Sequence, residues 1–112
     1  MNIVVTVPKS EIKNIADEDQ HIADNPGAWM QYWSLKHIPQ KLKEGERVYF
    51  IENGYIKYYH IYLGWVRDFT CEVTNRFWPG INLQLQYPEV PLQNPIPMRG
   101  FQNFRYLEET YE

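Results

Sequence analysis

The chain has 112 residues, of which 44% are hydrophobic, so its length fits one domain with one core and its composition argues against general disorder. The formal net charge is −3, which argues against strong non-specific binding to duplex DNA, because such binding needs many phosphate contacts. Aromatic residues make up 16% of the chain, and they suit both pleated sheets and binding surfaces.

For cellular location and bound ions, the sequence supports only the default expectations. A single cysteine, Cys71, rules out an internal disulfide. No apolar run approaches the ~20 residues needed to span a bilayer, and no charged-then-apolar leader precedes a cleavage site. The acidic segment 17–24 lacks the glycine and terminal glutamate of a calcium loop. We therefore expect a soluble cytoplasmic protein with no membrane partner, no metal and no cofactor.

The first quarter of the chain predicts a strand followed by a helix. Residues 1–7 are rich in β-branched side chains and end at Pro8, which is typical of a buried strand. Residues 9–23 carry isoleucine and alanine at imperfect helical spacing among charges, with Ser10 as a candidate N-cap. An amphipathic helix over residues 9–23, or one that ends near Asp19, follows from this pattern.

A second, aromatic helix is predicted before residue 39. Asn25-Pro26 favours a helix start, with asparagine as N-cap and proline at the first helical position. Trp29, Tyr32 and Trp33 then fall at i, i+3 and i+4, which places them on one face of that helix. Pro39 ends the segment, and a short polar connection follows.

A β-hairpin is the strongest local signal in the sequence. Two apolar runs, residues 48–51 and 55–66, are separated by Asn53-Gly54. Both turn residues tolerate positive φ, as a two-residue hairpin turn requires. After a turn-like Arg67-Asp68, residues 69–74 predict another strand. The sequence therefore predicts a β-rich architecture around this hairpin.

The last third of the chain mixes strands with proline-rich connections. After a loop or tight turn at residues 78–80, residues 81–87 alternate strictly between apolar and polar side chains, which predicts a half-buried strand. Residues 88–97 hold several prolines and predict an extended connector. Residues 100–107 fit either a helix face or a strand. The order of elements predicts an α+β fold in one domain over residues 1–112: a small, mostly antiparallel β-barrel with short flanking helices.

Three motifs, in this order, resemble the PUA-like superfamily, in particular its EVE and ASCH branches. Residues 43–50 (KEGERVYF) resemble the entry into a central barrel strand, and residues 61–66 (IYLGWV) resemble the next strand. Trp78, followed by the alternating residues 81–87, is similar to the later tryptophan-led strand of EVE domains. The resemblance implies a PUA-like barrel that binds RNA or a modified or flipped nucleobase without catalysis.

Six residues are candidates for such a ligand site. Aromatic side chains stack on unpaired bases, and arginine or lysine contacts phosphate. Trp33 and Trp78 are expected as stacking walls, with Trp29 on the same predicted helix face as Trp33. The candidate phosphate contacts are Lys36, Arg47 and Arg99. Each group also has a structural interpretation, in which the aromatic face packs on the sheet and the basic residues are solvated.

Two other function classes remain open. One is a small nucleoside- or RNA-directed hydrolase of the same fold, for which His60 with Cys71, or Glu72 with Lys57 or Lys36, are the candidate groups. The other is a protein-interaction module of phage or mobile-element origin, because exposed aromatics and net acidity suit a protein partner.

Overall fold

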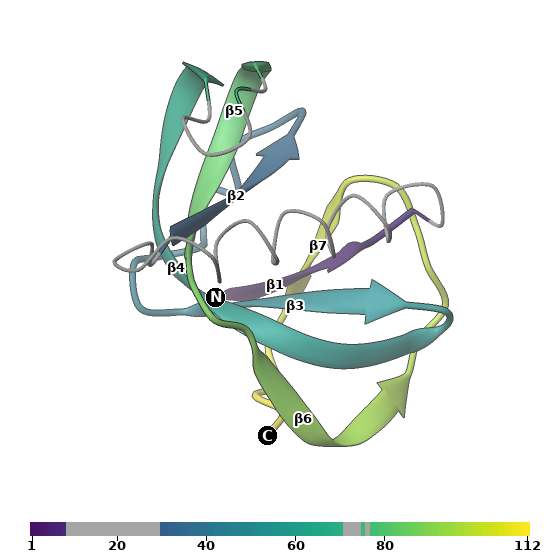
Figure 1. Cartoon of the computed structure of the whole chain (residues 1–112). Helices are drawn as coiled ribbons and strands as arrows, with labels where there is room; N and C mark the ends of the chain where they lie inside the picture. The colour runs from purple at the N-terminus through teal and green to yellow at the C-terminus, as the bar shows by residue number, and fades with distance from the viewer. Residues whose placement is uncertain (9–29, 71–74, 76) are drawn as a thin grey trace.

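The computed structural model describes residues 1–8, 30–70, 75 and 77–112. Seven strands form one mixed sheet (Figure 1). In chain order they are β1 (Asn2–Thr6), β2 (Met30–Leu35), β3 (Arg47–Glu52), β4 (Tyr55–Thr70), β5 (Phe77–Gln86), β6 (Val90–Pro97) and β7 (Phe104–Leu107). The strands lie in the order β2-β5-β4-β3-β1-β7, and β6 pairs with β4 beside this path. The β1–β3 pair is parallel and every other pair is antiparallel.

The sheet has two halves that share the long strand β4. The first part of β4 pairs with β3 and β6, and from Tyr62 onward it pairs with β5. The register shifts between Tyr62 and Gly64, where Gly64 has φ 146°, and such a bulge bends a strand. We call β1, β3, β6, β7 and the first part of β4 the β3 half, and β2, β5 and the rest of β4 the β5 half. The β5 half stands above the β3 half in Figure 1.

The predicted α+β barrel with flanking helices is wrong for the part of the chain that the structure describes. Those residues contain strands and no helix, and the mixed sheet is open. A barrel needs its two end strands to pair, whereas among the described strands β2 pairs only with β5 and the four-residue β7 pairs only with β1. The sheet over the described residues is therefore open, with β2 and β7 as its end strands.

The aromatic helix is also wrong where it can be compared with the structure. Met30–Leu35 is strand β2, paired antiparallel with β5 through contacts such as Trp33 with Leu83. Tyr32 and Trp33 therefore point to opposite faces of the sheet. Their short spacing fits either period, and pairing with β5 decides in favour of the strand. Trp29 and the predicted helix over residues 9–23 lie outside the described residues.

The local predictions of strands and turns fare better. Glu52 pairs with Tyr55 across Asn53 and Gly54, whose φ values are 52° and 82°, so the predicted hairpin is confirmed. The first strand is also confirmed as β1. The predicted turn at Arg67-Asp68 is instead a bulge inside β4, with Asp68 at φ 50°. The proline-rich connector is extended but pairs with β4 as β6, and residues 104–107 form a strand.

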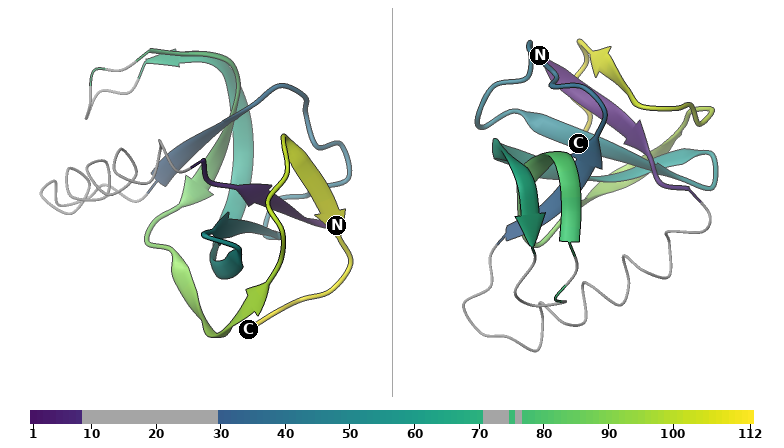
Figure 2. Two further views of the ribbon diagram at one scale, coloured as in Figure 1. Left: turned by 90° about the vertical axis from the view of Figure 1, so that its right-hand side faces the viewer. Right: turned by 90° about the horizontal axis from the view of Figure 1, so that it is seen from above.

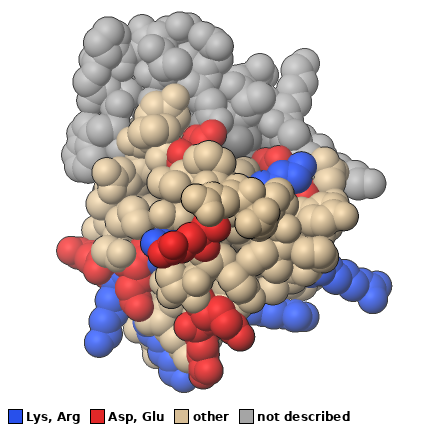
Figure 3. Space-filling model, turned by 90° about the horizontal axis from the view of Figure 1, so that it is seen from below, with Lys and Arg blue, Asp and Glu red and all other residues tan. Residues whose placement is uncertain are grey.

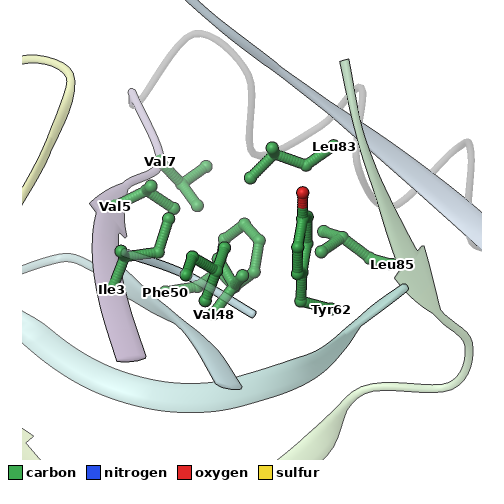
Figure 4. Packing of buried hydrophobic residues seen from close by; sticks show 9 residues of the cluster. Ile3, Val5, Val7, Val48, Phe50, Tyr62, Leu83 and Leu85 are labelled. Atoms are coloured by element: carbon green, nitrogen blue, oxygen red, sulfur yellow. The ribbon is translucent and has the colours of Figure 1, made fainter. Parts of the chain in front are cut away.

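Apolar side chains pack on both faces of the β3 half. One cluster lies between the two halves, with Val5, Phe50 and Tyr62 among its members (Figure 4). A second cluster, which includes Tyr49, Ile56 and Leu107, lies on the opposite face. The paired strands β1 and β3 are buried on both faces, which explains their nearly continuous apolar sequences. The core therefore sits around β1 and β3, and the β5 half covers one side of it.

Candidate nucleic-acid interface

Three of the six predicted site residues lie on the β5 half. Trp33 is half-buried on β2 and packs edge-on against Phe50, with ring centroids 5.0 Å apart at 89°. Lys36 is exposed and directly follows β2, whose last residue Leu35 pairs with Ile81. Trp78 is half-buried on β5, three residues before Ile81. Lys36 and Trp78 therefore lie toward the same end of this half.

The two predicted arginines lie elsewhere, at opposite ends of β3. Arg47 begins β3, and its Nη1 donates a hydrogen bond to the carbonyl oxygen of Tyr111 at 2.6 Å. Arg99 is exposed after β6, and the neighbouring Met98 N–H bonds to Gly54 beyond the other end of β3. The structure therefore does not gather the six residues into one site. Trp29 lies outside the described residues.

Several aromatic side chains instead lie along the β5 half: Phe69, Phe77 and Trp78 near the free end of the β4–β5 pair, and Trp65 farther along β4, opposite Leu83. Trp65 and Phe77 are the most exposed of these, at 39% and 59%. Phe69 pairs with Trp78 and stacks on Tyr32, with ring centroids 3.9 Å apart at 22°. We call Tyr32, Trp65, Phe69, Phe77 and Trp78 the aromatic ribbon, in which Tyr32 and Trp65 point to opposite faces of the sheet. Sequence reasoning missed four of these five as site residues, because it placed a turn inside β4 and a helix over β2.

Polar contacts fix the bend of this ribbon. The backbone N–H of Gly80 donates to the Asp68 carboxylate at 2.7 Å, opposite the bulge in β4. The fully buried Asn82 side chain donates to the carbonyl oxygens of Trp78 and Gly80 and accepts a hydrogen bond from the Ser34 hydroxyl at 2.6 Å. One amide thus ties β2 to the irregular start of β5. Figure 2 shows β4 and β5 bending over together at their free end.

The charge around the ribbon is modest. The Arg67 guanidinium lies 6.0 Å from the ring centre of Trp65, and Lys36 and His37 are exposed just after β2. Arg67 is the one lysine or arginine among residues 65–70 and 77–86. Around the ribbon, the described residues therefore offer aromatic rings with a few cations. Figure 3 shows the molecule from below, on the side away from the ribbon, where basic and acidic side chains are interspersed.

His60 is a buried, uncharged contact between the two halves. It lies on β4 with 4% of its surface exposed, and its Nδ1 is 2.8 Å from the carbonyl oxygen of Gln86 at the end of β5. Burial lowers the pKa of His60 below its ordinary value of 6.5, although the Gln86 carbonyl and the Glu89 charge act in the opposite direction. Phe50 and Tyr58 contact the ring edge-on. Its proposed companion Cys71 lies outside the described residues.

Comparisons with protein-family models, with curated proteins and with solved structures gave no match. The resemblance to the PUA-like superfamily therefore stays a prediction. Among the described residues, no group of three or more histidine, cysteine, aspartate or glutamate side chains is arranged to hold a metal ion. No helix in the described part of the chain is long and apolar enough to cross a membrane.

Proposed function

We propose that the protein binds unpaired nucleic acid, such as single-stranded RNA or a modified or flipped base, through the aromatic ribbon and without catalysis. The observation that carries the proposal is the exposure of the Trp65 and Phe77 side chains on the bent β4–β5 pair. Every base has a face that can stack on such a ring, and each stack is worth ~1–3 kcal/mol. Hydrogen bonds of Asn82 and Asp68 hold the bend of the β4–β5 pair. The backbone that carries these rings therefore loses little conformational freedom when a ligand binds.

The proposed site includes two of the residues expected from the sequence, adds one arginine and leaves out two others. Trp78 belongs to the ribbon and Lys36 is exposed near it, so both stay as candidate contacts. Arg67, beside Trp65, joins them as a cation. Trp33 packs on Phe50 and Arg47 bonds to Tyr111, so the proposal does not depend on either.

A protein partner is the second candidate function. The observation in its favour is the shortage of cations, since Arg67 is the one lysine or arginine among residues 65–70 and 77–86. Exposed aromatic side chains are enriched at the centres of protein interfaces, where charged side chains are depleted. Binding to nucleic acid must therefore be measured directly.

The test is titration of a labelled single-stranded RNA of ~10 nucleotides, a length within the site sizes of stacking domains. The matched ligand is the same strand with abasic positions, which keeps the phosphates and removes the stacking faces. Stacking predicts binding of the intact strand only. With Lys36 and Arg67 as the phosphate contacts, the slope of log affinity against log salt should be about −1.4.

Variants of the protein locate the site. Trp65→Ala and Phe77→Ala should each weaken binding ~5- to 150-fold, the equivalent of one lost stack. Tyr55→Ala is the matched control, because Tyr55 is also an exposed aromatic residue of β4 but lies on the β3 half. Absence of binding at low salt, or equal binding of the abasic strand, would exclude the stacking site and favour the protein partner.

A further inference from the structure

Tyr49 makes two hydrogen bonds to the backbone of a single residue. Its ring is fully buried in the second core cluster, and its hydroxyl lies beside residue 111. The backbone N–H of Tyr111 donates to this hydroxyl at 2.8 Å, and the hydroxyl donates to the carbonyl oxygen of Tyr111 at 3.0 Å. A hydroxyl can donate and accept at once, so one side chain contacts both polar groups of one residue.

Arg47, two residues before Tyr49 on β3, makes a further contact with Tyr111. Its Nη1 donates to the same Tyr111 carbonyl oxygen at 2.6 Å, a short bond of the charge-assisted kind. The guanidinium lies 4.1 Å from the ring centre of Tyr59, which holds the plane of the cation in position. Arg47 Nη1 is also 3.4 Å from the Tyr49 hydroxyl. We call Arg47, Tyr49 and Tyr59 the peptide clamp.

The rest of segment 108–112 is held mainly through its backbone. Asn2 Nδ2 donates to the carbonyl oxygen of Glu109 and to the Thr110 hydroxyl, each at 3.3 Å. The Tyr111 ring packs against the second core cluster and meets the Tyr49 ring edge-on, with centroids 5.9 Å apart. The three glutamates of the segment are exposed. What the protein contacts is thus backbone groups, the Thr110 hydroxyl and one aromatic ring, not the acidic side chains.

We infer that the peptide clamp is a binding site for a peptide that presents an aromatic residue, and that segment 108–112 is its ligand within the chain. The clamp bonds to the backbone N–H and carbonyl of one residue, which almost any peptide can supply, and the Tyr111 ring adds the selective contact. A partner peptide of this kind takes the site when the chain's own segment leaves it. The clamp belongs to the β3 half, so this site is separate from the aromatic ribbon.

Competition within the chain governs how such a peptide binds. A tethered segment acts as a ligand at an effective concentration of about 1 mM or more, and a free peptide must exceed this to displace it. Weakening the tethered segment should therefore open the site to the same sequence added from outside. Tyr111→Gly removes the ring from the core cluster and leaves the clamp residues intact.

The experiment titrates the peptide acetyl-Glu-Glu-Thr-Tyr-Glu into the full chain and into its Tyr111→Gly variant, with the Arg47 side-chain NMR signal as readout. We expect saturable binding to the variant below about 5 mM peptide, and at least ~10-fold weaker binding to the unchanged chain. A peptide with alanine in place of tyrosine should not bind. A peptide with glutamine in place of each glutamate should bind as well as the original.

Equal affinity for both proteins, no saturable change in the variant, or equal binding of the alanine peptide would overturn the inference. A second measurement covers the case in which Tyr111→Gly fails to fold. In Tyr49→Phe, which keeps the ring and removes the hydroxyl, hydrogen exchange of the Tyr111 amide should accelerate at least ~10-fold while the β1 and β3 amides stay protected. Unchanged protection of the Tyr111 amide would overturn the inference equally.

Discussion

The two halves of the sheet bury their side chains differently. Strands β1 and β3 are covered on both faces, by one apolar cluster on each side. The β5 half is apolar on the face toward the first cluster, while its other face carries Gln84 and the bonded Asn82, and its free end exposes aromatic rings. The β3 half thus has the features of a stabilising framework, and the β5 half carries the aromatic side chains of the proposed stacking site.

One row of side chains on the β5 half leads from a packed position to an exposed one. Trp33 and Trp65 both pair with Leu83, from opposite sides of β5, so the three side chains share a face. At one end of the row Trp33 packs on Phe50 of the β3 half, whereas at the other end Trp65 is 39% exposed. Two tryptophans in equivalent positions therefore allow a packing role and the proposed binding role to be compared directly.

Trp33→Ala should have the largest effect on stability. Removing this ring leaves a cavity against Phe50, and we expect a loss of ~3 kcal/mol, at the lower end for large aromatic truncations because Trp33 is half-buried. Trp65→Ala should cost less than ~1 kcal/mol, as for a surface substitution. Urea melts of the two variants measure both values. Equal losses would show that the row does not run from core to surface.

The sequence predicts the parts of the fold that depend on near neighbours. The hairpin turn is specified by Asn53 and Gly54 alone, and β1 by its own β-branched side chains. Strand β2 was mistaken for a helix because its partner β5 lies far along the chain and the short aromatic pattern fits both periods. The open sheet was missed for a related reason, since closure depends on which end strands meet.

The candidate site divides in the same way. Exposed aromatics and a nearby lysine could be expected from composition and order, and the structure does place Trp78 and Lys36 toward one end of the β5 half. The pattern around Arg47 could not show that its guanidinium bonds to Tyr111, more than sixty residues away. Trp65 and Phe77 were missed because their exposure depends on how β4 and β5 pair and pack, which the neighbouring residues do not specify.

Gly54→Val should have an intermediate effect, in the framework half. Gly54 has φ 82°, and a Cβ there would meet no atom within 4 Å, so the cost comes from backbone strain rather than from a clash. We expect a loss of ~1–2 kcal/mol, the cost of a left-handed conformation, and more if the β-branched side chain adds to it. Gly54→Asn is the control, because asparagine tolerates this conformation. A urea midpoint for Gly54→Val equal to that of the unchanged protein would mean that the turn does not need positive φ.

The last predicted effect is a pH dependence at His60, where the two halves meet. His60 lies opposite Val48 of β3, and its imidazole contacts the carbonyl oxygen of Gln86 in β5. Because burial lowers the pKa of His60 in the folded protein below the ordinary 6.5, the unfolded chain binds a proton more readily. The full contribution of neutral His60 to stability is therefore present above about pH 6.5 and is lost as the pH falls toward the folded-state pKa.

This loss has an upper limit of ~1.4 kcal/mol per pH unit, the slope for one proton. Urea midpoints between about pH 7.5 and pH 5 measure it, with His60→Gln as the control that keeps a polar side chain but does not titrate. The unchanged protein should lose stability over this range, and the variant should lose less, because the contribution of His60 is absent from it. The same pH dependence in both proteins would mean that His60 accepts its proton without breaking the contact to Gln86. In that case the contact between the β3 half and the β5 half would tolerate a charged His60, which the burial of this side chain argues against.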